Sequence, residues 1–329
     1  MLNSYWIIIS LFLLTISACK PVTHEPIKRW QQAVDGAYAG QISSDAKYSV
    51  ISSLYHGLSV WDLKTNQRLY NWSQQQKSSD NLVHTIDISD NASHVVTADK
   101  QNFALWSLKS GKSEGYWQVR ESHIRDIAIS NQGNHLLIGK SNAVVVHVTV
   151  DTGRRLEFLG HKEKINSVDM MPNGRVVMSG GNDFIANVWD SQSGQIIYQF
   201  NHTSRVSKVA LDPQGRFAFS ADSMKTAYLW DLTTGKLVSQ LAGVKRHEVF
   251  STVHFSNNGK TLLTGAASRK VSAWDIASGK RLTHWYVSPK EAKRPTGAVV
   301  YGLAFSDNSN ILSISSSGYL ESWPMPKSP

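Results

Sequence analysis

Short runs of alternating apolar and polar residues, separated by turns rich in Gly, Asn and Asp, recur along most of this chain. In the clearest example, Ile165–Met170 alternates, Val176–Ser179 is rich in β-formers, and Ala186–Trp189 forms a third run. Pro172–Gly174 separates the first two runs, because Pro fixes φ and Gly supplies φ > 0. Gln195–Phe200 follows as a fourth run. The pattern predicts four short β-strands within about 40 residues.

A small turn motif shows that this four-strand unit is repeated. It has a Ser or Thr followed by Gly or Asn, and it occurs at Thr65-Asn66, Ser110-Gly111, Thr152-Gly153, Ser193-Gly194, Thr234-Gly235 and Ser278-Gly279. The second residues of these pairs are 45, 42, 41, 41 and 44 residues apart. Four of the turns directly follow a Trp-Asp pair, Trp106-Ser107 and Val148-Thr149 hold that place in the other two, and Trp323 ends a seventh unit without the turn. The repeats predict one continuous repeat domain over 27–329 rather than several domains.

One unit begins with Gly160-His161 and ends with Trp189-Asp190, and it resembles a repeat of the WD-repeat β-propeller family. The resemblance implies an all-β fold, a seven-bladed β-propeller with four-stranded blades. It also implies that His161, Ser179, Asp183 and Trp189 form a buried hydrogen-bond chain. We interpret this set as structural rather than as a catalytic triad, because the Trp N–H and the imidazole need partners when buried.

The seventh unit stops after its third strand, which would leave an open sheet edge. Ile27–Val34 looks like an isolated outer strand and is similar to Lys236–Ala242, the outer strand of another unit. We therefore expect the N-terminal strand to close the ring as the fourth strand of the last blade, as is familiar in the family.

The N-terminus reads as a secretion signal. Tyr5–Ala18 is almost wholly apolar, too short to span a bilayer comfortably, and typical of a signal-peptide core. Ile16–Cys19 resembles the lipobox of bacterial lipoproteins, although Met1–Ser4 contains no Lys or Arg. The sequence predicts a signal peptide over 1–18, then a lipidated Cys19 and a short linker over 19–26. The alternative is an ordinary signal peptide in which Cys19 has no role.

A lipidated Cys19 would make this a membrane-anchored protein of the bacterial periplasm. Cys19 is the only cysteine, so no disulfide is expected. Lys20 follows it where such lipoproteins often have Asp when they stay in the inner membrane, which favours the outer membrane. About seven residues join Cys19 to the closing strand, at most about 25 Å when extended. We therefore expect the bottom face, with the turns between strands one and two and strands three and four, to lie near the membrane.

Partner binding on propellers is usually at the opposite, top face. Aligning the repeats places Leu82, His123, Lys164, Arg205 and Val249 at equivalent top positions. His123, Lys164 and Arg205 come from three consecutive blades and predict a basic patch for an acidic partner or an anionic glycan. Phe250 and Tyr301 are the candidate anchors at the inner rim. Two longer top loops, Ser73–Asn81 and Ser288–Gly297, are further candidates.

The formal net charge is +9, with basic residues spread through the predicted bottom turns, which suggests weak attraction to anionic lipid headgroups. We expect no nucleic-acid partner for a periplasmic lipoprotein. Nucleotide-binding loops and metal-ligand motifs are not found, and the twelve His are scattered, so no cofactor or metal is predicted.

We therefore expect a non-enzymatic interaction scaffold that binds an envelope protein. The alternatives are a propeller enzyme of the periplasm, such as a hydrolase or quinone-dependent dehydrogenase, and a glycan or cell-wall binder. Fold cannot decide among them.

Overall fold

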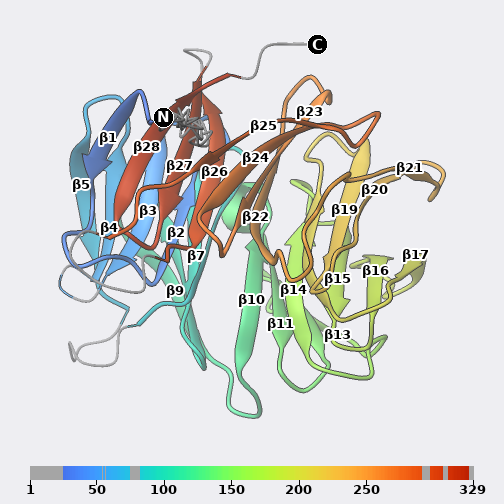
Figure 1. Ribbon diagram of the computed structural model, residues 1–329. Coiled ribbons are helices and arrows are strands. Elements are labelled where there is room, and N and C mark those ends of the chain that lie inside the picture. Colours follow the sequence, from blue (N-terminus) through green and yellow to red (C-terminus); the bar gives the residue numbers. More distant parts are fainter. Residues whose placement is uncertain are drawn as a thin grey trace, which may run out of the picture.

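The computed structural model describes residues 25–53, 55, 57–74, 82–290, 297–306 and 310–325 as seven four-stranded antiparallel sheets arranged around an axis (Figure 1). Blade 1 contains β2 (Ala39–Ile42), β3 (Tyr48–Ser53), β4 (Gly57–Asp62) and β5 (Gln67–Trp72). Blade 2 contains β6 (Thr85–Ile88), β7 (His94–Ala98), β8 (Asn102–Ser107) and β9 (Ser113–Gln118). Blade 3 contains β10 (Ile124–Ile129), a 3₁₀ turn η1 (Asn131–Gly133), β11 (His135–Lys140), β12 (Val145–Thr149) and β13 (Arg155–Phe158).

The second half of the ring repeats the same meander. Blade 4 contains β14 (Ile165–Met170), β15 (Val176–Gly181), β16 (Ile185–Asp190) and β17 (Ile196–Asn201). Blade 5 contains β18 (Val206–Leu211), β19 (Phe217–Asp222), β20 (Ala227–Asp231) and β21 (Leu237–Gln240). Blade 6 contains β22 (Phe250–Phe255), β23 (Thr261–Ala266), β24 (Lys270–Asp275) and β25 (Arg281–Tyr286). Blade 7 contains β26 (Val300–Ser306), β27 (Asn310–Ser315), β28 (Tyr319–Pro324) and β1 (Lys28–Gln31). The predicted seven-bladed propeller is confirmed.

The ring is closed by the N-terminal strand, as predicted. β1 pairs antiparallel with β28, with Lys28 opposite Ser322 and Gln31 opposite Tyr319, and Figure 1 shows β1 (blue) beside β28 (red) in this sheet. The pairing gives β28 a fourth-strand neighbour and removes an open edge from the ring. Among the described residues, no helix has the length and apolarity needed to cross a membrane.

The core lies between adjacent blades and is built largely by the repeated Trp. Trp189 in β16 stacks on Phe158 of the preceding blade, with ring centroids 4.3 Å apart. Trp230 stacks on Phe200 at 4.1 Å in the same way. The third strand of one blade therefore packs on the fourth strand of the blade before it, and each such aromatic pair buries a large apolar area. Blade 3 differs, because Val148 occupies this position.

The turn motif has a local physical cause, which blade 4 shows clearly. Asp190 Oδ1 accepts hydrogen bonds from the backbone N–H of Gln192 and Ser193, both at 2.9 Å. The Gly194 N–H then donates to the Asp190 carbonyl at 2.8 Å, with Gly194 at φ 74°. Only Gly adopts that conformation without strain, so Asp and Gly together fix the reversal from the third strand to the fourth.

Candidate functional site

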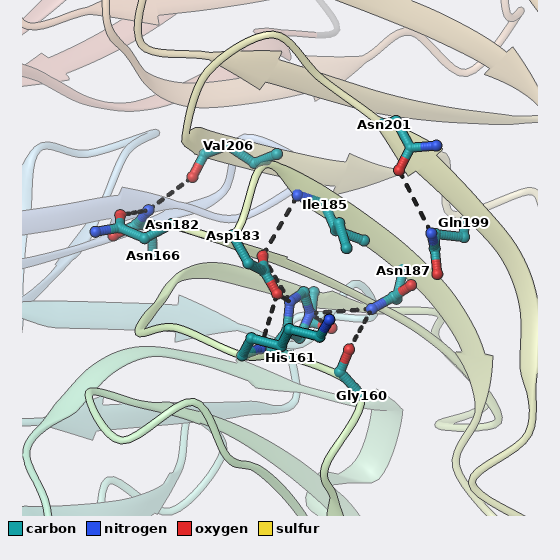
Figure 2. Close-up of polar contacts among 12 residues, drawn as sticks. Gly160, His161, Asn166, Asn182, Asp183, Ile185, Asn187, Gln199, Asn201 and Val206 are labelled. Atoms are coloured by element: carbon teal, nitrogen blue, oxygen red, sulfur yellow. Dashed lines mark hydrogen bonds and ion pairs between the residues drawn. The ribbon is translucent and has the colours of Figure 1, made fainter.

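A buried polar chain ties together the strands of blade 4 (Figure 2). His161 precedes β14, and its Nδ1 lies 2.9 Å from Asp183 Oδ2, while its Nε2 lies 2.9 Å from Ser179 Oγ. Since Nδ1–H donates to the carboxylate, Nε2 accepts from the Ser179 hydroxyl, and that hydroxyl accepts from Trp189 Nε1–H at 3.2 Å. Both the His161 side chain and Ser179 are 0% exposed. No substrate can reach either group, so this arrangement serves packing and not catalysis.

The electrostatics of Asp183 fit this structural role. Burial alone would raise the pKa of Asp183, but hydrogen bonds from His161 and from the Lys162 backbone N–H lower it below its ordinary value. The carboxylate is therefore held in its charged form as the end of the chain. It also fixes the turn between β15 and β16, because Oδ1 accepts from Ile185 N–H at 3.3 Å.

Blade 5 keeps a version of this chain that sequence reasoning missed. His202 Nε2 lies 2.8 Å from Ser220 Oγ, which also accepts from Trp230 Nε1–H at 2.8 Å. The carboxylate is supplied by Asp222, 3.9 Å from His202 Nδ1, rather than from the position of Met224. Burial lowers the pKa of His202 to about 4, so it is neutral at pH 7. Its position 41 residues after His161, equal to the local turn spacing, is the signal that could have revealed it.

The three basic candidates lie where the repeat alignment predicted, just before the first strands of blades 3, 4 and 5. His123, Lys164 and Arg205 are all exposed. Arg205 Nε donates to Ser223 Oγ at 3.1 Å, which holds the guanidinium against the adjoining top turn. Further exposed basic side chains on top loops and turns are Lys100, Arg120, Lys162, Lys225, Lys245 and Arg246. Glu121 and Glu163 are exposed acids beside them. The face is therefore mixed in sign but mainly basic.

The two candidate anchors behave differently. Phe250 is only 2% exposed and packs edge-on against Phe219, with centroids 5.8 Å apart. The expectation that Phe250 contacts a partner at the rim is therefore wrong, because its side chain points into the core between blades 5 and 6. Tyr301 is half-buried and lines the top of the central channel, where its hydroxyl donates to the Ala37 carbonyl at 3.3 Å. Burial raises the pKa of Tyr301 to about 12.

Exposed apolar side chains on the top of blade 4 were not predicted. Leu159, in the loop before β14, is 72% exposed, and Phe184, in the turn between β15 and β16, is 49% exposed. Phe184 has φ 68°, a conformation uncommon for a bulky residue. Both side chains lie near the loop that carries Lys164 and are exposed apolar groups, unlike Phe250.

The top mouth of the central channel is a polar cavity of about 260 Å³. Lys208 Nζ lies 3.9 Å from Asp126 Oδ2 across its wall. Asp126 also accepts hydrogen bonds from Thr85 Oγ1 at 3.1 Å and from the Val168 N–H of the next blade at 3.1 Å. The carboxylate is thus fully engaged in joining neighbouring blades.

Two further carboxylates line a smaller cavity of about 110 Å³ towards the bottom of the channel. Asp87 Oδ2 accepts from Ile129 N–H at 3.0 Å, and Asp169 Oδ2 accepts from Leu211 N–H at 2.6 Å. Burial, together with the charge of Asp169, raises the pKa of Asp87 to about 7. Burial likewise raises the pKa of Asp169 to about 6 against the effect of these hydrogen bonds. Each carboxylate clasps the innermost strand of the next blade.

Metal-binding groups are not assembled in the part of the chain that the structure describes, where no three His, Cys, Asp or Glu side chains converge. Two histidines do meet: His135 and His147 stack with ring centroids 5.1 Å apart. His147 is 1% exposed, and neither of its ring nitrogens has a hydrogen-bond partner among the described residues. Burial lowers the pKa of His147 to about 4, so it is a neutral core side chain at pH 7.

Several predictions fall outside the described residues. These are the signal peptide over 1–18, Cys19 and its linker up to residue 24, and most of the two long top loops, at 75–81 and 291–296. They stay predictions from the sequence.

Comparison with known proteins agrees with the repeat structure. The family model "WD domain, G-beta repeat" matches residues 153–190, 194–231 and 235–275. Each matched segment takes the fourth strand of one blade and the first three strands of the next. The three segments therefore cover blades 4, 5 and 6 apart from the outer strand of blade 6.

Three relatives are similar over part of the chain. The WD repeat-containing protein SL1-17 of Schistosoma mansoni is 24% identical over 164 residues, which are 49% of this chain and 53% of the relative. The U3 small nucleolar RNA-associated protein 15 homolog of Xenopus laevis is 22% identical over 174 residues, 52% of this chain and 33% of the relative. An uncharacterized WD repeat-containing protein, sll1491 of Synechocystis sp., is 33% identical over 107 residues, 31% of this chain and 30% of the relative. The chain thus spans about half or less of these relatives.

Proposed function

Because the chain belongs to the WD-repeat β-propeller family, we propose that it is a non-enzymatic scaffold whose top face binds an acidic protein of the bacterial cell envelope. Propellers of this family are typically interaction scaffolds. The observation that carries the proposal is the set of exposed basic side chains, His123, Lys164 and Arg205, that three consecutive blades present at equivalent positions.

The described residues offer a physical basis for recognition. Lys164 and Arg205 supply charge for steering and for charge-assisted hydrogen bonds, and Ser223 pre-orients Arg205. Leu159 and Phe184 add exposed apolar surface beside them. Interfaces draw most of their affinity from a few such apolar and Arg anchors, so a compact acidic surface with an apolar centre is the expected partner.

The placement in the envelope rests on the sequence alone. A lipid chain on Cys19 would tether the propeller by its closing strand, which begins at the bottom of blade 7. The anchor would sit in the outer membrane rather than the inner one, and the bottom face would lie near that membrane. The top face would then be free to meet its partner.

Cross-linked capture from intact cells tests this function with two charge-reversal variants. Lys164→Glu/Arg205→Glu changes the top face, whereas Lys109→Glu/Lys260→Glu makes the same net change in exposed bottom turns. We expect wild type and the bottom variant to capture the same envelope protein and the top variant to lose it. Equal capture by both variants would refute a basic docking face. A Cys19→Ser variant that stays in the membrane fraction would separately refute the lipid anchor.

A further inference from the structure

Blade 3 has neither the Trp that the other blades carry in the third strand nor the buried polar chain of blade 4. Register places Val148 where blade 4 has Trp189 and Ile138 where blade 4 has Ser179. Arg120 precedes Val148 by the same 28 residues that separate His161 from Trp189. The whole polar chain is therefore absent between blades 2 and 3, together with the indole that fills this slot elsewhere.

Blade 2 fills the slot only in part, although Trp117 packs against the cluster that contains Ile138 and Val148. Trp117 in β9 holds the place from which Phe158 stacks on Trp189, but it lies over its own blade, stacked on Phe103 with centroids 5.1 Å apart. A Cβ atom at Gly115 would come within 2.0 Å of this ring, so Gly115 is what lets Trp117 lie flat. The result is an interblade pocket of about 270 Å³, with an apolar floor made by Phe103, Ile138, Val146 and Val148.

A buried lysine lines this interblade pocket. Lys140 is only 5% exposed, and its ammonium has no hydrogen-bond or ion-pair partner among the described residues. The register puts Lys140 at the position of Gly181, whose α-carbon adjoins His161 and Asp183 in blade 4. The lysine chain thus enters the space that the polar chain occupies there. The stem of Lys140 is buried while its ammonium reaches the space of the pocket, where an anion would supply a partner that the described residues do not.

The rim limits the charge of the ligand. The lining contains three cations, which are Arg120, Arg155 and Lys140, and two carboxylates, which are Glu121 and Glu157. The formal net charge of the lining is therefore +1. A single negative charge balances this set, whereas a highly charged phosphate would meet the two glutamates. The apolar floor requires that the anion carry an aliphatic or aromatic group.

We propose that the interblade pocket binds a small amphiphilic carboxylate, with its carboxylate on Lys140 Nζ and its apolar group on Val148 and Ile138. A free aliphatic acid and the C-terminal residue of a peptide share this chemistry. The pocket shares Arg120 and Glu121 with the edge of the top face, but its ligand and its test do not depend on the scaffold function.

Isothermal titration calorimetry with matched probes tests the proposal and separates the two sources. Octanoate and neutral octanamide share one chain, and acetyl-Gly-Leu with a free or an amidated C-terminus represents the peptide source. We expect at least one carboxylate to bind, and to bind about tenfold or more tightly than its amide, as a charge-assisted hydrogen bond implies. Tighter binding of octanoate assigns the free acid, and tighter binding of acetyl-Gly-Leu assigns the peptide end. If neither carboxylate binds, or each binds like its amide, the proposal is wrong.

Three variants connect the binding to this pocket. Lys140→Met should remove the tenfold preference for the carboxylate but leave amide binding intact. Val148→Trp should restore the indole, fill the slot and abolish both, and circular dichroism checks that it folds. Lys164→Met, on the top face, is the control and should bind as wild type does. Unchanged carboxylate binding in Lys140→Met would overturn the assignment whether or not Val148→Trp folds.

Discussion

Asp87 provides a sharp test of the electrostatics of the central channel. Its two oxygens accept hydrogen bonds from Ile88 N–H and Ile129 N–H, both at 3.0 Å, and the second bond joins blade 2 to blade 3. Burial, and then the charges of Asp169 and Asp126, raise the pKa of Asp87 from 3.8 to about 7. The folded chain therefore holds this proton up to about pH 7, whereas the unfolded chain releases it near pH 3.8. Stability must fall as the pH rises between these values.

The change Asp87→Asn removes this charge. The pKa of Asp87 shifts from 3.8 to about 7, and each pKa unit corresponds to about 1.36 kcal/mol. The charge of Asp87 can therefore lower the folding stability by at most about 4 kcal/mol. Asn keeps one acceptor oxygen and loses the other, at a cost of about 1 kcal/mol. Since the charge of Lys208 offsets part of this effect, we expect Asp87→Asn to gain about 1–3 kcal/mol of stability relative to wild type on going from pH 5 to pH 8.

Urea denaturation of wild type and Asp87→Asn at pH 5 and pH 8 measures this difference from the unfolding midpoints. Asp222→Asn is the control of opposite sign. Burial would raise the pKa of Asp222, but hydrogen bonds from Thr226, Met224 and Lys225 outweigh it and lower that pKa below its ordinary value. Asp222→Asn should destabilise the fold at pH 8 and less so at pH 3. If the difference in unfolding free energy between Asp87→Asn and wild type is the same at pH 5 and pH 8, the pKa of Asp87 is not raised in the folded chain and the reasoning fails.

Three other predictions concern the blades and the ring. Ser179→Ala should cost about 2–4 kcal/mol in unfolding free energy, because it removes the hydrogen-bond partner of two buried side chains. Ser315→Ala, at an equally buried hydroxyl that has no partner among the described residues, should stay within about 0.5 kcal/mol in the same urea titration. A chain starting at residue 36 lacks β1 and should form oligomers through β28 in size-exclusion chromatography, while one starting at residue 25 should stay monomeric. Lys270→Met should cost about 3–5 kcal/mol by leaving Glu248 buried without its partner at 3.0 Å, and adding Glu248→Leu should recover much of that loss; an additive double mutant would contradict the pairing.

The ring could be predicted because its determinants are local and repeated. Each Asp-x-x-x-Gly reversal and each alternating strand is specified by neighbouring residues, so the spacing gave the repeated units, and the family resemblance then gave the blades and the closing strand. The burial of Phe250 could also have been predicted from the repeat. The equivalent first residues of other blades, Ile124, Ile165 and Val206, are all apolar and all buried. Position in the repeat outweighed the aromatic residue type, which had suggested a rim anchor.

The channel carboxylates could not be predicted in the same way. Asp87 and Asp169 share one position in the first strand, but Asp126 lies one level higher on the wall. Three isolated acids at unequal spacings look like ordinary polar strand residues. Only ring closure brings them to one axis, where the charges of Asp169 and Asp126 add to burial in raising the pKa of Asp87, and the charge of Asp126 adds to burial in raising that of Asp169.

The position at which one blade departs from the repeat is the best indication of a binding site in this molecule. Every other blade keeps a Trp in its third strand, and blade 3 has Val148. A slot emptied without consequence would be expected to fill with apolar side chains, since packed interiors are the stable ones. Instead the slot contains Lys140, which is buried and unpaired among the described residues. Its ammonium reaches the pocket and can pair with an anion there, so the proposed binding role accounts for both the missing indole and the added charge.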